Sequence, residues 1–266
     1  MDNIFQYAFM QRAFVVAAII AVIAPCIGVS IVLKRLSAIG DATSHSALAG
    51  IAFGLLLGIN PILGAVMFSI FAVIGIEVFR KSFGKYSEIA TVVVMSAGIG
   101  LTAVLSGFIT NGSTNINSFL FGSIVAINDF ELYLTIGLGI AVIITSILLY
   151  KELFFVTFDE EAAKLAGVPV GGINLVLMLL TTVSVASRIV GALMISSLLV
   201  IPVAAAMMIA KSYKQTIWWS IAFAEFFTVA GLFISYYLDL RPGGTIVLLG
   251  VVFLIVIMAC TSKRRR

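Results

Sequence analysis

The chain of 266 residues is 62% hydrophobic and only 11% charged, and its mean hydropathy is +1.21. Ordinary soluble domains are roughly 45–50% apolar and about 25% charged, so this composition excludes a water-soluble globular fold. The net charge of +4 is small and lies mostly in short segments between apolar runs. Nucleic-acid binding is not expected, because it needs basic residues gathered on one solvated face.

Long runs without a charged side chain divide the sequence. A membrane-spanning helix needs about 20 mostly apolar residues, and several runs reach or exceed that length. The sequence therefore predicts an all-α, polytopic transmembrane bundle of about eight to nine spans, folded as one domain over 1–266. Neither a cleavable signal peptide nor a soluble appendage is expected. The runs without Asp, Glu, Lys or Arg are 13–33, 42–76, 89–128, 132–150, 165–187, 189–210 and 242–262.

Turn residues and proline set the boundaries between candidate spans. Asn60-Pro61 separates the second span from the third, because proline cannot continue a helix interior. The apolar segment 116–127, after a polar turn at 111–115, is too short to cross and is predicted to be re-entrant or interfacial. The predicted spans are about 13–33, 37–58, 61–79, 89–109, 131–150, 172–187, 189–210, 216–237 and 244–260.

The distribution of lysine and arginine predicts the orientation. Short cytoplasmic loops of membrane proteins are enriched in these residues. If the loop with Lys34 and Arg35 is cytoplasmic, all but three of the 16 basic residues fall on that side, the exceptions being Arg12, Arg188 and Arg241. We therefore expect the N-terminus outside and the C-terminus in the cytoplasm.

Asp41 and His45 are polar groups in the second predicted span. A rise of ~1.5 Å per residue from Arg35 puts them ~9 Å and ~15 Å along the helix, and the i, i+4 spacing puts both on one face. Ionisable groups at that depth cost at least ~2.5 kcal/mol each and normally mark a pathway. Together they form a plausible half-site for Zn²⁺, Mn²⁺ or Fe²⁺. Alternatively, Asp41 caps the helix and His45 makes an interhelical hydrogen bond.

Two further residues interrupt apolar spans. Glu225 lies near the middle of the eighth predicted span, where it is either a carboxylate of a cation pathway or a protonated, hydrogen-bonded acid. Pro202 is predicted to kink the seventh span. That kink serves either a moving hinge or a static, packed bundle.

The segment 158–169 differs from the other loops. It is predicted to form a short cytoplasmic coupling helix over about 158–168, with Asp159, Glu160 and Glu161 in its first turn, where negative charge favours the helix dipole. Gly167 ends the helix, and Pro169 prevents its continuation. A partner protein is favoured over docking on the inner membrane face, because an anionic leaflet repels the three acids.

Several motifs, in one order, resemble those of a known family. Residues 41–50 (DATSHSALAG) resemble the D-x-x-S-H-x-x-L-x-G stretch of metal-importing ABC-3 permeases. Residues 190–206 resemble the V-G-A-L…L-L-x-I-P-A-A-x-A segment of that family, and 121–123 and 243–247 match at the expected places. Glu161-Ala162-Ala163 with Gly167 resembles the EAA-type loop by which ABC-importer permeases contact their ATPase subunits. The similarity covers nearly the whole chain.

This resemblance implies a permease subunit of an ATP-driven importer in a bacterial plasma (inner) membrane. It implies a homodimer in contact with lipid, bound to separate cytoplasmic ATPase subunits and receiving Zn²⁺ or Mn²⁺ from an extracytoplasmic binding protein. The metal is cargo, so no permanent cofactor and no enzymatic activity of this chain are expected. Asp41 and His45 become the metal-contacting pair, and Asp159, Glu160, Glu161, Ala162, Ala163 and Gly167 the coupling residues. Ala49 favours the zinc-type members.

Two other functional classes fit the sequence less well than an ATP-driven importer. A secondary-active metal transporter also needs intramembrane Asp and His but has no use for an EAA-like loop. An intramembrane protease needs H-E-x-x-H or a Ser–His pair near an exposed nucleophile turn. Neither pattern is present, since Ser44 and His45 are sequence neighbours that point in different directions on a helix.

Overall fold

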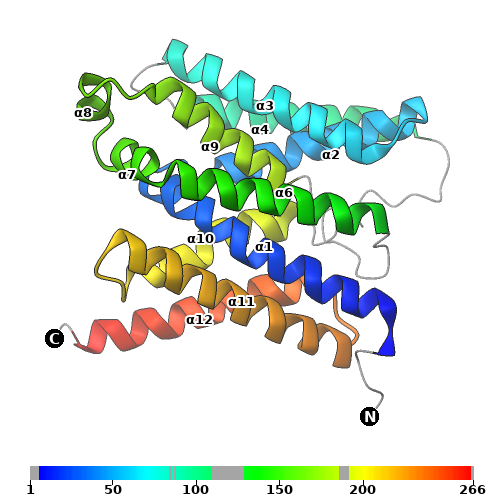
Figure 1. Cartoon of the computed structure of the whole chain (residues 1–266). Helices are drawn as coiled ribbons and strands as arrows, with labels where there is room; N and C mark the ends of the chain where they lie inside the picture. The colour runs from blue at the N-terminus through cyan, green and yellow to red at the C-terminus, as the bar shows by residue number, and fades with distance from the viewer. Residues whose placement is uncertain (1–5, 84–85, 87, 110–128, 186–191, 265–266) are drawn as a thin grey trace.

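Helices and short connections make up all of the chain that the computed structural model describes, which is residues 6–83, 86, 88–109, 129–185 and 192–264 (Figure 1). Arg188 and the predicted re-entrant segment 116–127 lie outside these residues. The described helices are α1 (Ala8–Leu33), α2 (Ile39–Leu57), α3 (Pro61–Phe83), α4 (Glu88–Gly107), α6 (Asp129–Leu148), α7 (Tyr150–Phe158), α8 (Glu160–Leu165), α9 (Val170–Val185), α10 (Ala192–Met207), α11 (Tyr213–Tyr237) and α12 (Pro242–Arg264).

The longer helices run back and forth along one common direction, so the two termini lie at opposite ends of the bundle (Figure 1). Five described helices are long and apolar enough to cross a membrane, namely α1, α3, α4, α11 and α12. The pair α6–α7, bent by 68°, counts as a sixth if it forms one span. The α2 helix is not among them, and α9 and α10 are shorter apolar helices. The all-α bundle is confirmed, while the count of eight to nine spans stays a prediction.

The predicted break between the second and third segments is present and has a local cause. Gly58 ends α2 with a left-handed φ of +68°, a conformation that glycine adopts without steric cost. The Asn60 side-chain oxygen accepts a hydrogen bond from the Ile62 N–H at 2.9 Å. Pro61 is the first residue of α3, where its missing N–H would have had no helical partner.

Close contacts between small residues hold α2 against its neighbours. A side chain at Gly50 would overlap the carbonyl group of Gly64, and a side chain at Gly64 would overlap that of Gly50. The backbones of α2 and α3 therefore touch directly, as small residues allow between membrane helices. Gly28 of α1 packs in the same way against the Leu199 backbone of α10.

The segment predicted to be a coupling helix does contain a short helix, α8, although it is shorter than 158–168. Asp159 is its N-cap, and its carboxylate accepts a hydrogen bond from the Ala162 N–H at 2.9 Å. Gly167 has a left-handed φ of +82°, and the Val168 N–H donates to the Ala163 carbonyl at 3.0 Å, which closes the helix. The α7 and α8 helices lie at the end of the bundle that also holds the C-terminus, hereafter the α8 end (Figure 1).

Candidate metal site and coupling helix

Asp41 and His45 form a half-open strip on an otherwise covered helix. Between Ile39 and Ala52, only Asp41 and His45 are half-buried, and all the remaining residues are buried. The α3, α4, α9 and α10 helices cover the remaining faces of α2. The two side chains thus share the one face of this stretch that the chain's own helices leave partly open.

Glycines fix the position of this strip. A Cβ atom at Gly98 of α4 would lie 2.9 Å from the Ser46 nitrogen and 3.0 Å from the His45 carbonyl carbon. On another side, a Cβ atom at Gly40 would approach Leu199 and Ser196 of α10. Because α4 and α10 approach this closely, the α2 backbone on either side of Asp41 is held between them.

The hydroxyl groups on the buried faces of α2 bond within the bundle. Thr43 donates to the Ile39 carbonyl at 2.8 Å, and Ser46 donates to the Ala42 carbonyl at 2.9 Å. Ser69 of α3 donates to the Thr43 carbonyl at 3.4 Å. These bonds satisfy the hydrogen-bonding capacity of the buried hydroxyl groups. The polar groups of the strip itself are the Asp41 carboxylate and the His45 imidazole.

The helix start bears on the capping interpretation of Asp41. Ala38 is the N-cap of α2 and makes no side-chain cap hydrogen bond. Asp41 therefore lies inside the first turn and not at the cap position. Its charge still favours the positive end of the helix dipole, but it does not fill the role of a capping residue.

One copy of the chain supplies only part of a metal site. Within the described residues, no three His, Cys, Asp or Glu side chains come together in a group able to hold a metal. Stable sites for transition metals commonly use four or more ligands, of which at least three come from the protein. Asp41 and His45 alone therefore offer two donors, a carboxylate oxygen and an imidazole nitrogen.

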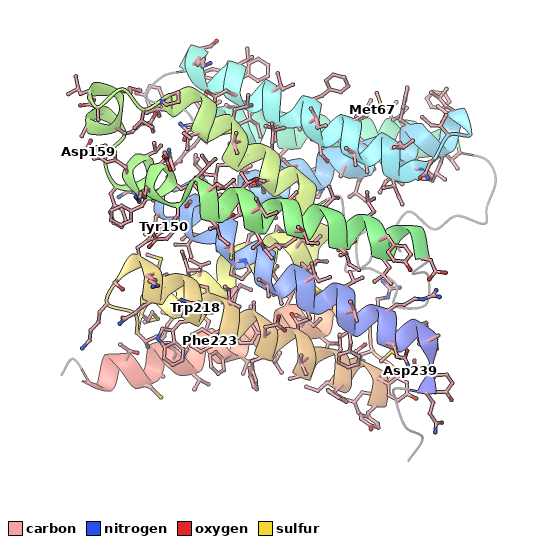
Figure 2. The ribbon with its side chains drawn as sticks, viewed as in Figure 1. Met67, Tyr150, Asp159, Trp218, Phe223 and Asp239 are labelled. Carbon is pink, nitrogen blue, oxygen red and sulfur yellow. The ribbon has the colours of Figure 1, made fainter. Side chains whose placement is uncertain are left out.

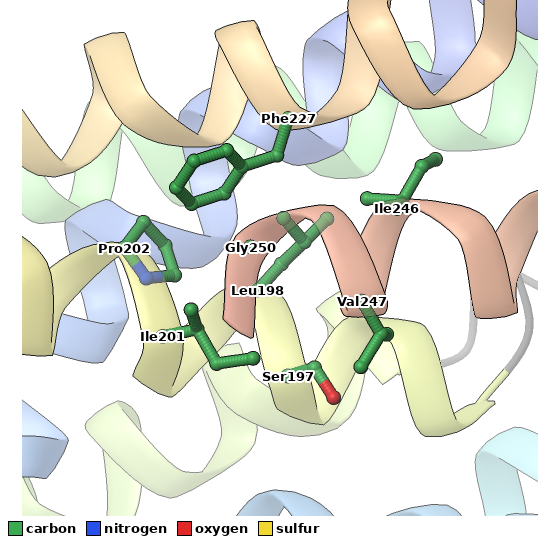
Figure 3. A pocket seen from close by; sticks show the side chains of 8 residues that line it. All are labelled: Ser197, Leu198, Ile201, Pro202, Phe227, Ile246, Val247 and Gly250. Atoms are coloured by element: carbon green, nitrogen blue, oxygen red, sulfur yellow. The ribbon is translucent and has the colours of Figure 1, made fainter. Parts of the chain in front are cut away.

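Glu225 and Pro202 lie elsewhere in the bundle. Glu225 is half-buried on α11, which packs against α1, α10 and α12, and the structure does not bring it together with Asp41 and His45. The α10 helix runs through Pro202 as one helix. Figure 3 shows Pro202 beside a small apolar hollow between α10, α11 and α12, lined by Ser197, Leu198, Ile201, Pro202, Phe227, Ile246, Val247 and Gly250.

The α8 helix has an anchored face and an outer face. Ala163 is fully buried, while Glu161, Lys164 and Gly167 are exposed. Leu165 is 90% exposed, the highest value among the large exposed hydrophobic side chains of the described residues. Sequence reasoning did not single out Leu165. The sequence could have indicated Leu165, because it lies four residues after Glu161 and residues four apart share a helix face.

Glu160 faces the bundle instead of the outer surface. Its carboxylate lies 3.4 Å from the Lys34 ammonium at the end of α1, and 3.7 Å from that of Lys164 in α8 itself. Asn174 of α9 accepts a hydrogen bond from Lys34 and donates one to Glu160 at 3.5 Å. Burial lowers the pKa of Lys34, and the nearby Glu160 carboxylate partly opposes this shift.

Comparison with known proteins places this arrangement in a family. The model of the ABC 3 transport family matches residues 6–261. This chain belongs to the ABC 3 transport family. The match covers nearly the whole sequence, including α2, α8 and α10, so the resemblance inferred from the motifs is confirmed at the level of the family.

Individual ABC 3 family relatives align over almost their full length. A Treponema pallidum (strain Nichols) protein named "Probable metal transport system membrane protein" is 35% identical over 264 residues, which is 98% of each chain. The "Manganese import system permease protein ScaB" of Streptococcus parasanguinis is 34% identical and is matched over 95% of its length. A solved structure, PsaBC from Streptococcus pneumoniae in complex with Fab, superposes with a TM-score of 0.84 at 33% identity, covering 96% of this chain and 93% of that one.

The family assignment also bears on enzymatic activity. ABC 3 members are membrane components of transport systems, and several relatives are named permeases. This chain is accordingly a multi-pass membrane permease and not an enzyme. The family motif residues 121–123 and 190–191 fall outside the described residues, whereas 41–50 and 243–247 lie in α2 and α12.

Proposed function

We propose that this ABC 3 family chain is the permease subunit of an ATP-driven importer, and that Mn²⁺ is its cargo. The observation that carries the proposal is the half-open strip formed by Asp41 and His45 on a helix that is otherwise covered. An ion-conducting protein needs sites that bind weakly enough for release. Two donors from one chain suit passage better than storage.

The choice of metal follows from the relatives more than from the site itself. A carboxylate and an imidazole are ligands for manganese and for zinc alike. Ala49, on which the zinc preference depended, is fully buried and offers no donor to a metal. Relatives from Streptococcus parasanguinis and Listeria monocytogenes are named as manganese import or transport proteins, which supports Mn²⁺ over Zn²⁺.

The proposed partners follow from the two ends of the bundle. The exposed face of α8, with Glu161 and Leu165, is the surface for a cytoplasmic ATPase subunit, and Gly167 lets the chain turn away from it. A second copy of the chain would bring a second Asp41–His45 pair and complete a four-donor passage site. An extracytoplasmic protein would deliver the metal at the end opposite α8.

The deciding experiment is metal uptake by the reconstituted transporter. The permease, its ATPase and its binding protein are placed in liposomes, and uptake of radioactive Mn²⁺ is followed with and without ATP, with Zn²⁺ as competitor. We expect ATP-dependent Mn²⁺ uptake. Uptake that persists without the ATPase would instead indicate a secondary-active transporter, and full ATP-dependent uptake of Zn²⁺ without Mn²⁺ uptake would restore the zinc assignment.

Two substitutions test the strip in the same assay. His45→Ala removes the imidazole, and Asp41→Asn keeps the side-chain volume while removing the charge. Even partners of metal ligands are worth ~10–100-fold, so each change should reduce uptake about tenfold or more at unchanged membrane abundance. Asp239→Asn is the matched control, because it makes the same chemical change in an aspartate outside the strip. Asp239 lies at the opposite end of the bundle from Asp159 (Figure 2). Near-normal uptake by Asp41→Asn would refute the charged-ligand role.

A further inference from the structure

The last turn of α1 connects the coupling helix to the rest of the bundle. Lys34 is the C-cap residue of α1, and its side chain is only 6% exposed. Its ammonium group reaches Glu160 of α8 and Asn174 of α9. We call these three residues the Lys34 link. A charged group with so little exposure is stable only when it is paired and hydrogen-bonded, so Glu160 and Asn174 are the groups that stabilise the buried Lys34 ammonium.

A second contact reaches α1 one turn before Lys34. Ser30, one turn before Lys34, is hydrogen-bonded to the Tyr213 hydroxyl at 2.8 Å. The Tyr213 ring lies 5.3 Å from that of Phe154 and 6.0 Å from that of Phe158, both in α7. The α7–α8 segment is therefore attached to the last turn of α1 by a polar contact and, through Tyr213, by an aromatic one.

A tight turn joins this point to the metal strip. Arg35, directly after Lys34, has a left-handed φ of +58°, which is uncommon for a residue other than glycine. The Leu36 N–H donates to the Ile31 carbonyl at 2.9 Å, and the Ile39 N–H donates to the Leu36 carbonyl at 2.9 Å. Three residues after Leu36, α2 begins, and Asp41 lies in its first turn.

We propose that Lys34 is a positioning residue that transmits displacement of α8 to the α1–α2 turn and thereby to Asp41. This inference rests on the proposed function, because it assumes that an ATPase moves α8 and that Asp41 contacts the metal. The path is short and continuous, from Glu160 through Lys34 and the turn at Arg35 to α2. Sequence reasoning listed Glu160 among the coupling residues, and the structure adds that its carboxylate contacts Lys34 and Asn174.

The chain offers a matched control for this link. Lys81 of α3 pairs with Glu77 of the same helix, at 3.7 Å, and its side chain is 73% exposed. Lys81→Gln therefore removes an exposed i, i+4 ion pair without changing α8 or its contact with Lys34. Exposed i, i+4 pairs are worth only ~0.3–0.5 kcal/mol, so this change should be nearly silent.

The test measures Mn²⁺ taken up per ATP hydrolysed in the reconstituted complex. Coupling between sites is typically worth ~5–150-fold, so Lys34→Gln and Glu160→Gln should each lower this ratio about fivefold or more. The double variant should be no worse than either single variant, and the charge exchange Lys34→Glu with Glu160→Lys should recover part of the loss. Lys81→Gln should leave the ratio within about twofold.

Several results would overturn the proposal. These are an unchanged ratio in Lys34→Gln, losses that multiply in the double variant, or an equal loss in Lys81→Gln. If Lys34→Gln does not fold, Glu160→Gln provides the test, because the Glu160 side chain is 38% exposed and its replacement disturbs the fold less. An unchanged ratio in Glu160→Gln would also overturn the proposal. Absence of ATP-dependent uptake by the unmodified complex would refute the proposed function itself, so the two failures are distinguishable.

Discussion

At the scale of single residues, packing around α2 identifies the candidate site as clearly as the charge of its residues does. Asp41 and His45 are notable because their neighbours along the helix are all buried. That burial depends on glycines that allow α3, α4 and α10 to approach α2 closely. The position of the Asp41–His45 strip is therefore set by residues that carry no functional group.

Gly98 provides a direct test of this dependence. Gly98→Ala would place a methyl group 2.9 Å from the Ser46 nitrogen and 3.0 Å from the His45 carbonyl carbon, which forces α4 away from α2. Overpacking of this kind costs typically ~1–3 kcal/mol. We expect a lower thermal unfolding midpoint in detergent and reduced Mn²⁺ uptake.

Gly100 on the same helix is the matched control for Gly98. A Cβ atom at Gly100 would meet nothing within 4 Å, and alanine is favoured over glycine in a helix by up to ~1 kcal/mol. Gly100→Ala should therefore keep or slightly raise the unfolding midpoint. Equal behaviour of the two variants would show that the contact between α4 and α2 does not position the strip.

At the scale of elements, α8 is a six-residue helix that cannot be stable alone. Isolated helices shorter than ~12–15 residues are marginal in water. Its stability comes from the Asp159 cap, the closure at Gly167, the buried Ala163 and the ion pair from Glu160 to Lys34. These anchors leave one face open, and Leu165 is the apolar residue on it.

Leu165 is expected to be a main contact for the ATPase subunit. Its side chain is 90% exposed, and burying a leucine in an interface contributes ~1.5–3 kcal/mol. Leu165→Gln should weaken binding of the purified permease to its ATPase by about tenfold or more, measured by co-purification and titration. Leu57→Gln, which alters an exposed leucine at the end of α2 and outside α8, is the control. Equal binding by both variants would exclude Leu165 from the interface.

At the scale of the whole molecule, local features were predictable from the sequence and contacts between distant segments were not. The break at Asn60-Pro61 and the end of α8 at Gly167 were correctly predicted because each depends on the backbone preferences of neighbouring residues. The pairing of Asp41 with His45 on one face follows from helical period alone. By contrast, the contact of Glu160 with Lys34 joins segments far apart in the chain, and only packing reveals it.

The same distinction applies to the choice of metal and to the α2 helix. Ala49 pointed to zinc by resemblance, yet it is buried and offers no ligand. The α2 helix falls outside the set of long apolar helices, although its sequence also suggested a span. Its hydroxyl residues Thr43, Ser44 and Ser46 are buried by neighbouring helices, which is a property of the assembled bundle and not of hydropathy.

Orientation in the membrane is the last property that belongs to the whole molecule. Asp159 and the C-terminus lie at one end of the bundle and Asp239 at the other (Figures 1 and 2). The distribution of lysine and arginine predicts that the α8 end is cytoplasmic. Lys164 and Asp239 are therefore predicted to lie on opposite sides of the membrane.

Labelling of introduced cysteines tests this orientation. In a background with Cys26 and Cys260 replaced by alanine, Lys164→Cys and Asp239→Cys are each treated with a membrane-impermeant maleimide in intact cells or, for an outer-membrane organism, spheroplasts. We expect Asp239→Cys to react and Lys164→Cys to stay unlabelled until the membrane is opened, because the reagent reaches only the outer surface. Lysed membranes, in which both should react, control for reactivity. Labelling of Lys164→Cys before lysis, with Asp239→Cys protected, would reverse the predicted topology and place α8 out of reach of any cytoplasmic ATPase.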